Sequence, residues 1–205
     1  MKKIPIAILA SGRGSNFNAI IENIKKGKCN AQINVLITNK IDAPAVEIAK
    51  KNSIPVEFLD KKKFKTREEM DDHLFVLLKK YSAELVVLAG YMLLIKSKKL
   101  LEFYKNRIIN IHPSLLPSFT GETAQKDAFE YGCKISGLTI HFVDEGLDSG
   151  PIIYQEAVDI SNCTDEFDVS QKILESEHQA YSYVIDLFSK GTFFVDGRKV
   201  IYKKH

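Results

Sequence analysis

The chain has 205 residues, of which 45% are hydrophobic and 27% charged, the balance of an ordinary soluble globular protein with a sizeable core. Its net charge of +3 comes from 29 Lys and Arg against 26 Asp and Glu without basic clustering, so we expect no nucleic-acid partner. No apolar run reaches the ~20 residues of a membrane-spanning helix. The three cysteines are widely spaced, which predicts neither a disulfide framework nor a metal site and favours a reducing, cytoplasmic location.

Strands and helices alternate along the first half of the chain. We expect strands at residues 4–10, 32–38, 55–59 and 85–89, and a further strand from residue 107. Helices are expected at residues 15–25, 43–51 and 66–81, and a short one capped by Ser97 runs to residue 104. This β-α-β-α order predicts an α/β fold with a mostly parallel open sheet and helices on both faces.

The pattern changes after Pro117. A helix at residues 124–131 precedes a strand at 135–143, a turn-rich stretch at 144–150 and a strand at 151–158 that could pair antiparallel. Thr164 opens a long helix, which is expected to end at Gly191. Asp196 and Gly197 form a turn signal between two short apolar runs, so the chain is predicted to end in a hairpin. The C-terminal portion is therefore expected to be antiparallel.

Two glycines, Gly12 and Gly14, follow the first strand and open the first helix. Free N–H groups at a helix start, together with the helix dipole, make an anion site. The loop lacks the Gly-Lys-Ser/Thr of a Walker loop, and Phe17 stands where a dinucleotide fingerprint needs its third glycine. The pattern fits a phosphate site and a tight turn capped by Ser15 or Asn16 equally well.

The most informative segment is I-N-I-H-P-S-L-L-P, at residues 109–117. Alternation along a strand puts Asn110 and His112 on one face. Pro113 then ends the strand, because it has no N–H for the sheet ladder. An amide and an imidazole therefore project together at the carboxyl end of a strand, where open α/β sheets bind ligands.

Three other features have both a structural and a functional explanation. Asp148, in L-D-S-G-P, is either a turn former or the carboxylate partner of a histidine, and the sequence does not decide between His112 and His141. Glu177 interrupts the apolar stripe of the long helix, where a structural salt bridge to a lysine is the simplest explanation. Residues 90–95, just past a central strand, are either core or the wall of a flat apolar ligand site.

Four motifs in order, S-G-x-G-S-N, A-G-Y-M, I-N-I-H-P-S-L-L-P and H-F-V-D-E-G-L-D-S-G-P, closely resemble the glycinamide ribonucleotide formyltransferases, folate-dependent enzymes of purine synthesis. The resemblance covers nearly the whole chain and implies the Rossmann-like formyltransferase fold. It also implies a single domain over residues 1–205, with a phosphate-binding half at 1–105 and a catalytic and folate-binding half at 106–205.

The resemblance assigns roles to individual residues. It implies a catalytic trio of Asn110, His112 and Asp148. The implied contacts to small-molecule substrates are Gly14, Ser15 and Asn16 for the phosphate, Glu177 for the sugar, and Arg67, Met92, Leu93, Leu94, Ile95 and Asn110 for the folate. The implied co-substrate is 10-formyltetrahydrofolate, with no metal. Asn110 and His112 would stabilise the tetrahedral intermediate, His112 would also carry the proton, and Asp148 would tune His112.

Some positions depart from the family pattern. Leu93 stands where some members have an arginine that contacts the folate glutamate tail. Leu174 replaces a polar or basic group, and Glu122-Thr123 differs from a stretch that contains histidine in some relatives. None of these positions belongs to the trio, so they concern substrate affinity more than the type of reaction.

Three alternatives remain to be weighed against formyl transfer. A formyltetrahydrofolate deformylase shares the trio but normally carries an extra N-terminal domain, whereas the first strand here begins at Ile4. A methionyl-tRNA formyltransferase would need a further domain after His205. A non-catalytic nucleotide-binding module would leave the trio unexplained. The sequence leaves monomer and homodimer open, and predicts no membrane partner.

Overall fold

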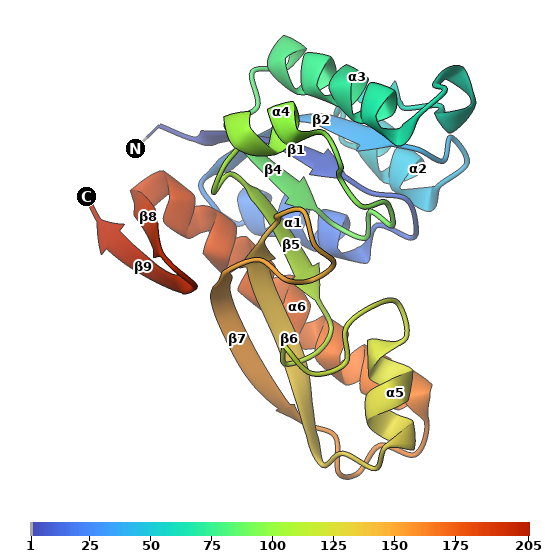
Figure 1. The fold of residues 1–205 in the computed structure, drawn as a ribbon. Helices are drawn as coiled ribbons and strands as arrows, with labels where there is room; N and C mark the ends of the chain where they lie inside the picture. The colour runs from blue at the N-terminus through green and yellow to red at the C-terminus, as the bar shows by residue number, and fades with distance from the viewer. Residues whose placement is uncertain (1) are drawn as a thin grey trace.

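The computed structural model describes residues 2–205, so Met1, the first residue of the expected domain, lies outside them. One sheet has the strand order β3-β2-β1-β4-β5-β6-β7 (Figure 1). Its strands are β1 (Ile4–Leu9), β2 (Ala31–Thr38), β3 (Val56–Phe58), β4 (Leu85–Leu88), β5 (Ile108–His112), β6 (Ile135–Phe142) and β7 (Ile152–Asp159). Pairings among β1 to β5 are parallel, and β6 and β7 join antiparallel. The predicted mostly parallel sheet and its antiparallel C-terminal portion are confirmed.

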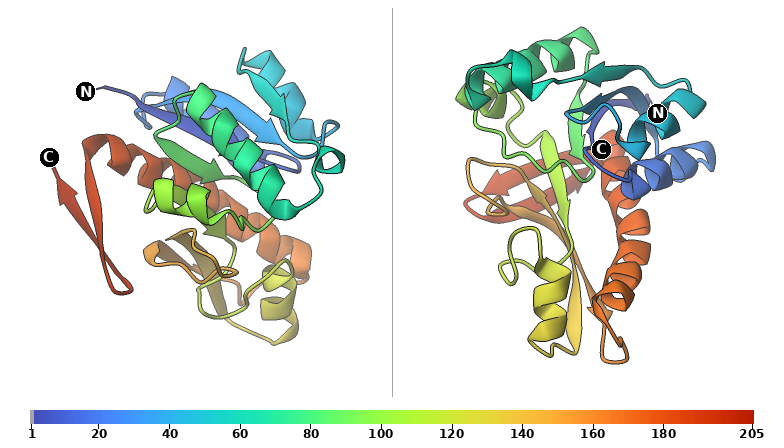
Figure 2. Two further views of the ribbon diagram at one scale, coloured as in Figure 1. Left: turned by 45° about the horizontal axis from the view of Figure 1, so that its top comes forward. Right: turned by 90° about the vertical axis from the view of Figure 1, so that its right-hand side faces the viewer.

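Helices cover both faces of this sheet, as predicted. They are α1 (Ser15–Lys25), α2 (Pro44–Lys51), α3 (Arg67–Lys80), α4 (Lys98–Phe103), α5 (Ala124–Glu130) and α6 (Glu166–Lys190), with a 3₁₀ turn at Lys61–Lys63 that the sequence did not predict. One buried cluster packs α3 and α4 on one face, and another packs α1, α2 and α6 on the opposite face (Figure 2). Within residues 2–205, none of these helices has the length and apolarity that a membrane crossing requires.

The starts of the helices follow local capping chemistry. Ser97 caps α4 as predicted, because its hydroxyl accepts from the Leu100 N–H at 3.3 Å. The long helix α6 begins slightly later than predicted. The carboxylate of Asp165 accepts from the Asp168 N–H at 2.8 Å and so fixes the helix start there rather than at Thr164.

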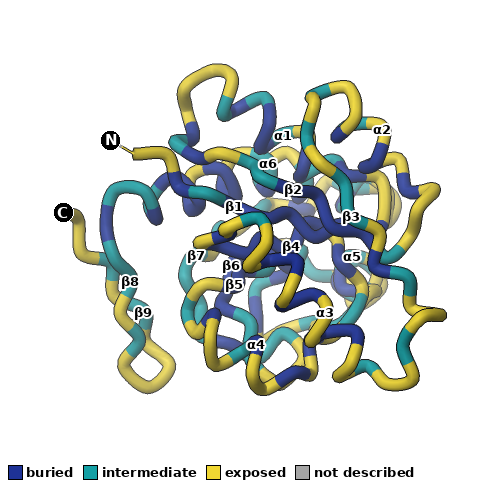
Figure 3. The backbone as a smooth tube through the Cα atoms, turned by 90° about the horizontal axis from the view of Figure 1, so that it is seen from above, coloured by how far each residue is buried: buried dark blue, intermediate teal, exposed yellow. Residues whose placement is uncertain are grey.

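A separate hairpin, β8 (Gly191–Asp196) with β9 (Lys199–Lys204), follows α6 and confirms the predicted turn. Its residues are mostly half-buried or exposed, at one side of the molecule (Figure 3). Gly191 is not the left-handed residue that commonly ends a helix, because its φ of −171° is extended. A Cβ at Gly191 would lie 2.4 Å from the Lys203 carbonyl oxygen, so close strand packing explains the glycine.

A buried tyrosine of α6 ties together the two central strands that lead to the candidate site. The Tyr181 hydroxyl lies 2.8 Å from the Leu88 carbonyl oxygen and 3.0 Å from that of Ile109. Leu88 ends β4, and Ile109 immediately precedes Asn110 in β5. The two carbonyls share the single hydroxyl hydrogen, so α6 is bonded to both strands close to the candidate site.

Candidate active site

The structure brings the predicted trio together at the carboxyl end of β5. Asp148, in the loop between β6 and β7, lies between two buried histidines. One carboxylate oxygen, Oδ2, is 3.4 Å from His112 Nδ1, and the other, Oδ1, is 3.7 Å from His141 Nε2. The Gly121 N–H donates to Oδ2 at 3.0 Å and holds the carboxylate in place. Both histidines that the sequence left open therefore lie near the carboxylate, and the contact with His112 is the shorter.

His112 faces an acceptor on each side of its ring. Its Nε2 lies 2.8 Å from the carbonyl oxygen of Phe119, and a carbonyl only accepts, so this nitrogen carries a hydrogen. Its Nδ1 faces the carboxylate of Asp148, which is also an acceptor when ionised. His112 therefore has an acceptor beside each of its two ring nitrogens.

His141 has a different role, which sequence reasoning missed. It pairs directly with Asn110 across β5 and β6, so both side chains lie on one sheet face. Its Nδ1 donates to the Phe142 carbonyl oxygen at 2.8 Å, and burial lowers the pKa of its imidazole, which leaves the ring neutral. Its Nε2 can then accept from Asn110 Nδ2 at 3.2 Å, and this bond fixes which way the Asn110 amide points. The pairing of His141 with Asn110 depends on the register between β5 and β6, and no short sequence pattern predicts that register.

The glycine loop after β1 is shaped by close packing against α2. Gly14 has a φ of +76°, and a Cβ there would lie 2.9 Å from the Ala45 Cβ, so only glycine fits without strain. Gly14 is also the N-cap of α1, and no side chain in residues 2–205 caps this helix. The predicted capping by Ser15 or Asn16 is therefore wrong. Without a side-chain acceptor, the N–H groups of the first turn can bind an external anion.

The side chain of Asn16 contacts Glu177 of α6. Its Nδ2 donates to Glu177 Oε2 at 2.9 Å. Glu177 is 5% exposed, and burial raises the pKa of its carboxyl to about 7, against the opposing effect of the Asn16 hydrogen bond. The described part of the chain offers Glu177 no lysine partner, so the expected salt bridge is absent there. The structure thus joins the predicted phosphate and sugar contacts, 161 residues apart.

The segment after β4 presents apolar side chains beside this edge of the sheet. The side chains of Met92 and Leu94 are 51% and 37% exposed, whereas Leu93 is half-buried and Ile95 buried. Exposed large apolar side chains next to a polar site are typical of a ligand-binding surface. The segment is therefore partly core and partly exposed, and the exposed part leaves room for the predicted ligand wall.

Arg67, at the start of α3, is hydrogen-bonded to the backbone of this segment. Its Nε donates to the Leu94 carbonyl oxygen at 3.0 Å, and its Nη2 lies 2.9 Å from Asp71 Oδ1. The carboxylate of Asp71 also accepts from the Lys96 N–H at 2.6 Å. Arg67 is thus placed beside the predicted folate wall with part of its guanidinium already bonded to the protein. No group of three or more His, Cys, Asp or Glu in residues 2–205 is arranged to hold a metal ion.

The chain is similar to known proteins over most of its length. A family model described as formyl transferase matches residues 4–185 and so ends before the β8–β9 hairpin. The chain is 40% identical over 185 residues to the phosphoribosylglycinamide formyltransferase of Bacillus subtilis (strain 168), with 90% of this chain and 93% of the relative covered. It is 36% identical over 191 residues to the trifunctional purine biosynthetic protein adenosine-3 of Homo sapiens, where it covers 93% of its own length and 19% of the relative.

A solved structure extends the agreement to the fold. Glycinamide ribonucleotide transformylase 1 from Symbiobacterium toebii superimposes with a TM-score of 0.93 and is 38% identical, with 98% of this chain and 94% of that chain covered. The trio, the glycine loop and the apolar segment thus occur within a fold shared over nearly the full length. The chain belongs to the formyl transferase family, among the phosphoribosylglycinamide formyltransferases.

Proposed function

We propose that this protein transfers the formyl group of 10-formyltetrahydrofolate to the amine of glycinamide ribonucleotide, a step of purine synthesis. The observation that carries the proposal is the position of Asn110, His112 and Asp148 at the sheet edge that also holds the Gly14 loop. β1, β4 and β5 are parallel neighbours, so their carboxyl ends lie side by side, where open α/β sheets bind ligands. A phosphate anchor and a proton-transfer group would thereby lie within reach of one small molecule.

The ribonucleotide would bind between the start of α1 and α6. The N–H groups of Ser15 and Asn16 and the positive end of the α1 dipole would hold its phosphate. Glu177 would accept from the sugar hydroxyls. The Asn16 Oδ1 atom supports this placement, because it is buried with no hydrogen-bond partner within the described residues, and a bound hydroxyl would satisfy it.

The folate would lie against the segment that follows β4. A flat ring placed over Met92 and Leu94 would remove their exposed apolar surface from water, which favours binding. Arg67 supports this wall through the Leu94 carbonyl and adds a cation next to it. Leu93 carries no charge toward an acidic folate tail, so we expect apolar contacts rather than an ion pair to dominate at that position.

The residues of the trio would divide the chemistry between them. As the amine attacks the formyl carbon, negative charge develops on the formyl oxygen, and the Asn110 amide would donate to it in the tetrahedral intermediate. The His112 Nε2–H would also donate to it, exchanging the Phe119 carbonyl oxygen for the formyl oxygen. A protonated His112 would then give its proton to the leaving folate nitrogen as the old carbon–nitrogen bond breaks, and the proton lost by the amine would restore it. Asp148 would balance the positive charge on His112, and His141 would keep the Asn110 amide oriented.

A steady-state assay with the purified protein tests the proposal. Folate turnover is expected only when glycinamide ribonucleotide is present, with one formylated ribonucleotide formed for each folate consumed. Turnover of the folate with water alone would instead identify a deformylase. Binding of the ribonucleotide without any turnover would identify a nucleotide-binding module and overturn the assignment.

A further inference from the structure

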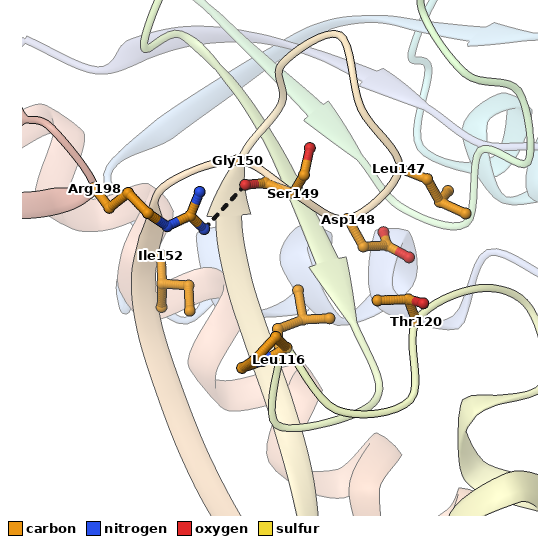
Figure 4. A pocket seen from close by; sticks show the side chains of 9 residues that line it. Leu116, Thr120, Leu147, Asp148, Ser149, Gly150, Ile152 and Arg198 are labelled. Carbon is orange, nitrogen blue, oxygen red and sulfur yellow. Dashed lines mark hydrogen bonds between the residues drawn. The ribbon is translucent and has the colours of Figure 1, made fainter.

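The C-terminal hairpin contacts the loop that carries Asp148. Arg198, in the turn between β8 and β9, donates from Nη2 to the carbonyl oxygen of Ser149 at 3.1 Å (Figure 4). Ser149 directly follows Asp148, and the bond spans 49 residues of sequence. The hairpin lies beyond the residues matched by the family model, so the resemblance gives Arg198 no role.

The backbone of Asp148 is in a conformation that the residue does not prefer. Its φ is +49°, in the left-handed region that non-glycine residues enter rarely. Aspartate tolerates this region better than most non-glycine residues but at some cost, so contacts around the loop help to hold it there. The position of the Asp148 carboxylate beside His112 therefore depends on what fixes the loop on either side.

Part of the loop is fixed from within. Gly150 lies so close to the end of β6 that a Cβ there would be 1.8 Å from the Phe142 carbonyl oxygen. The Ser149 hydroxyl donates to Asp144 Oδ1 at 2.6 Å, and the Gly146 N–H donates to the same oxygen at 3.0 Å. These contacts close the base of the loop and shape its turn, but they tie the loop only to itself and to β6.

Open space borders the loop. A cavity of about 420 Å³ is lined by Leu116, Ile152, Arg198, Asp148 and Ser149 (Figure 4). Side-chain packing around this part of the loop is therefore incomplete, and polar contacts contribute to holding it. The Arg198 bond reaches the loop across the rim of this cavity, from an element that otherwise stands apart from the site.

The geometry points to Arg198 as a positioning residue for the reaction, an inference that rests on the proposed function. By holding the Ser149 carbonyl, Arg198 keeps the neighbouring Asp148 in its left-handed conformation, with the carboxylate facing His112. Arg198 itself touches no reacting atom. A guanidinium stays protonated throughout the physiological pH range, so the contact does not depend on pH there.

Kinetics of single variants give the first test. Arg198→Ala should lower kcat by about 3- to 10-fold, the range expected for losing one hydrogen bond that matters to the reacting geometry, with KM changed by less than about twofold. Arg198→Lys keeps a donor and should recover part of the loss. Lys199→Ala, at the next exposed position of the hairpin, should leave kcat unchanged. Equal effects of Arg198→Ala and Lys199→Ala would overturn the inference.

A double-mutant cycle tests whether Arg198 acts through Asp148. In the Asp148→Asn background, Arg198→Ala should change the remaining kcat by less than about 1.5-fold, because coupled residues are not additive. The same fold-loss in both backgrounds would mean that Arg198 acts independently of Asp148, and the inference would be wrong.

Hydrogen exchange separates this inference from the proposed function. Amides of residues 144–150 should exchange faster in Arg198→Ala than in the wild type or in Lys199→Ala, whatever the enzyme's activity. If exchange rises as expected but the wild type shows no ribonucleotide-dependent turnover, the contact holds the loop and the proposed function is at fault. Unchanged exchange in Arg198→Ala would show that the hairpin does not hold the loop.

Discussion

Replacing Glu177 with glutamine separates the cost of a buried charge from the effect of shape, because the two side chains are nearly isosteric. Glu177 is 5% exposed on α6 and accepts a hydrogen bond from Asn16 at 2.9 Å. Glutamine keeps a carbonyl oxygen that can accept from Asn16. The substitution therefore removes the ionisable group while leaving the packing and this bond in place.

The structure sets both the size and the sign of the effect. Burial raises the pKa of Glu177 from its ordinary 4.5 to about 7. Each tenfold change in proton affinity corresponds to about 1.4 kcal/mol. The free energy of unfolding is therefore about 3 kcal/mol lower when Glu177 is ionised than when it is protonated. The folded state binds the proton more tightly than the unfolded state. The contribution of the protonated carboxyl is therefore complete below pH 4.5 and is lost as the pH rises through 7.

Urea unfolding at pH 5 and pH 8 measures this difference. At pH 5 the wild type and Glu177→Gln should differ by less than about 1 kcal/mol, whereas at pH 8 the variant should be the more stable by about 2–3 kcal/mol. Glu175→Gln, at an exposed position of the same helix, should change the free energy of unfolding by no more than about 0.5 kcal/mol at either pH. A gap between the wild type and Glu177→Gln that stays constant with pH would refute the reasoning.

Three further substitutions test the site. His112→Ala should lower kcat by ~10²–10⁴, the usual range for losing an acid–base group. His73→Ala, on the surface of α3, should leave kcat unchanged. Near-normal turnover of His112→Ala would contradict the mechanism. Asp148→Asn keeps an acceptor for the Gly121 N–H but removes the charge, so kcat should fall and its pH profile should move; an unchanged profile would make Asp148 only a turn former. Gly14→Ala should lower the free energy of unfolding by about 1–3 kcal/mol, because φ is +76° and a Cβ there would meet Ala45. Gly12→Ala, at a position with open space around it, should change the free energy of unfolding by no more than about 0.5 kcal/mol. Thermal melts of both variants measure the difference.

Local sequence determined the elements and much of the site. Alternating apolar periods predicted the order of strands and helices, because a residue's helix or strand preference depends on neighbours within a few positions. Pro113 located the end of β5, and the two-residue spacing placed Asn110 and His112 on one strand face. The predicted cap by Ser15 or Asn16 is wrong because the N-cap is Gly14, so both residues lie inside the helix. The Asn16 amide instead donates to a carboxylate 161 residues later, a contact that no local pattern contains.

Only the tertiary structure decided which distant groups meet. The antiparallel register of β5 and β6 sets His141 opposite Asn110, and the fold of the loop after β6 places Asp148 between two histidines. The contact of Arg198 with Ser149 depends in the same way on where the terminal hairpin packs. Strand register and loop packing follow from burial summed over the whole chain, so no short motif contains them. The sequence by itself determined which residues could do the chemistry, and the packing of the sheet decided how they are held to do it.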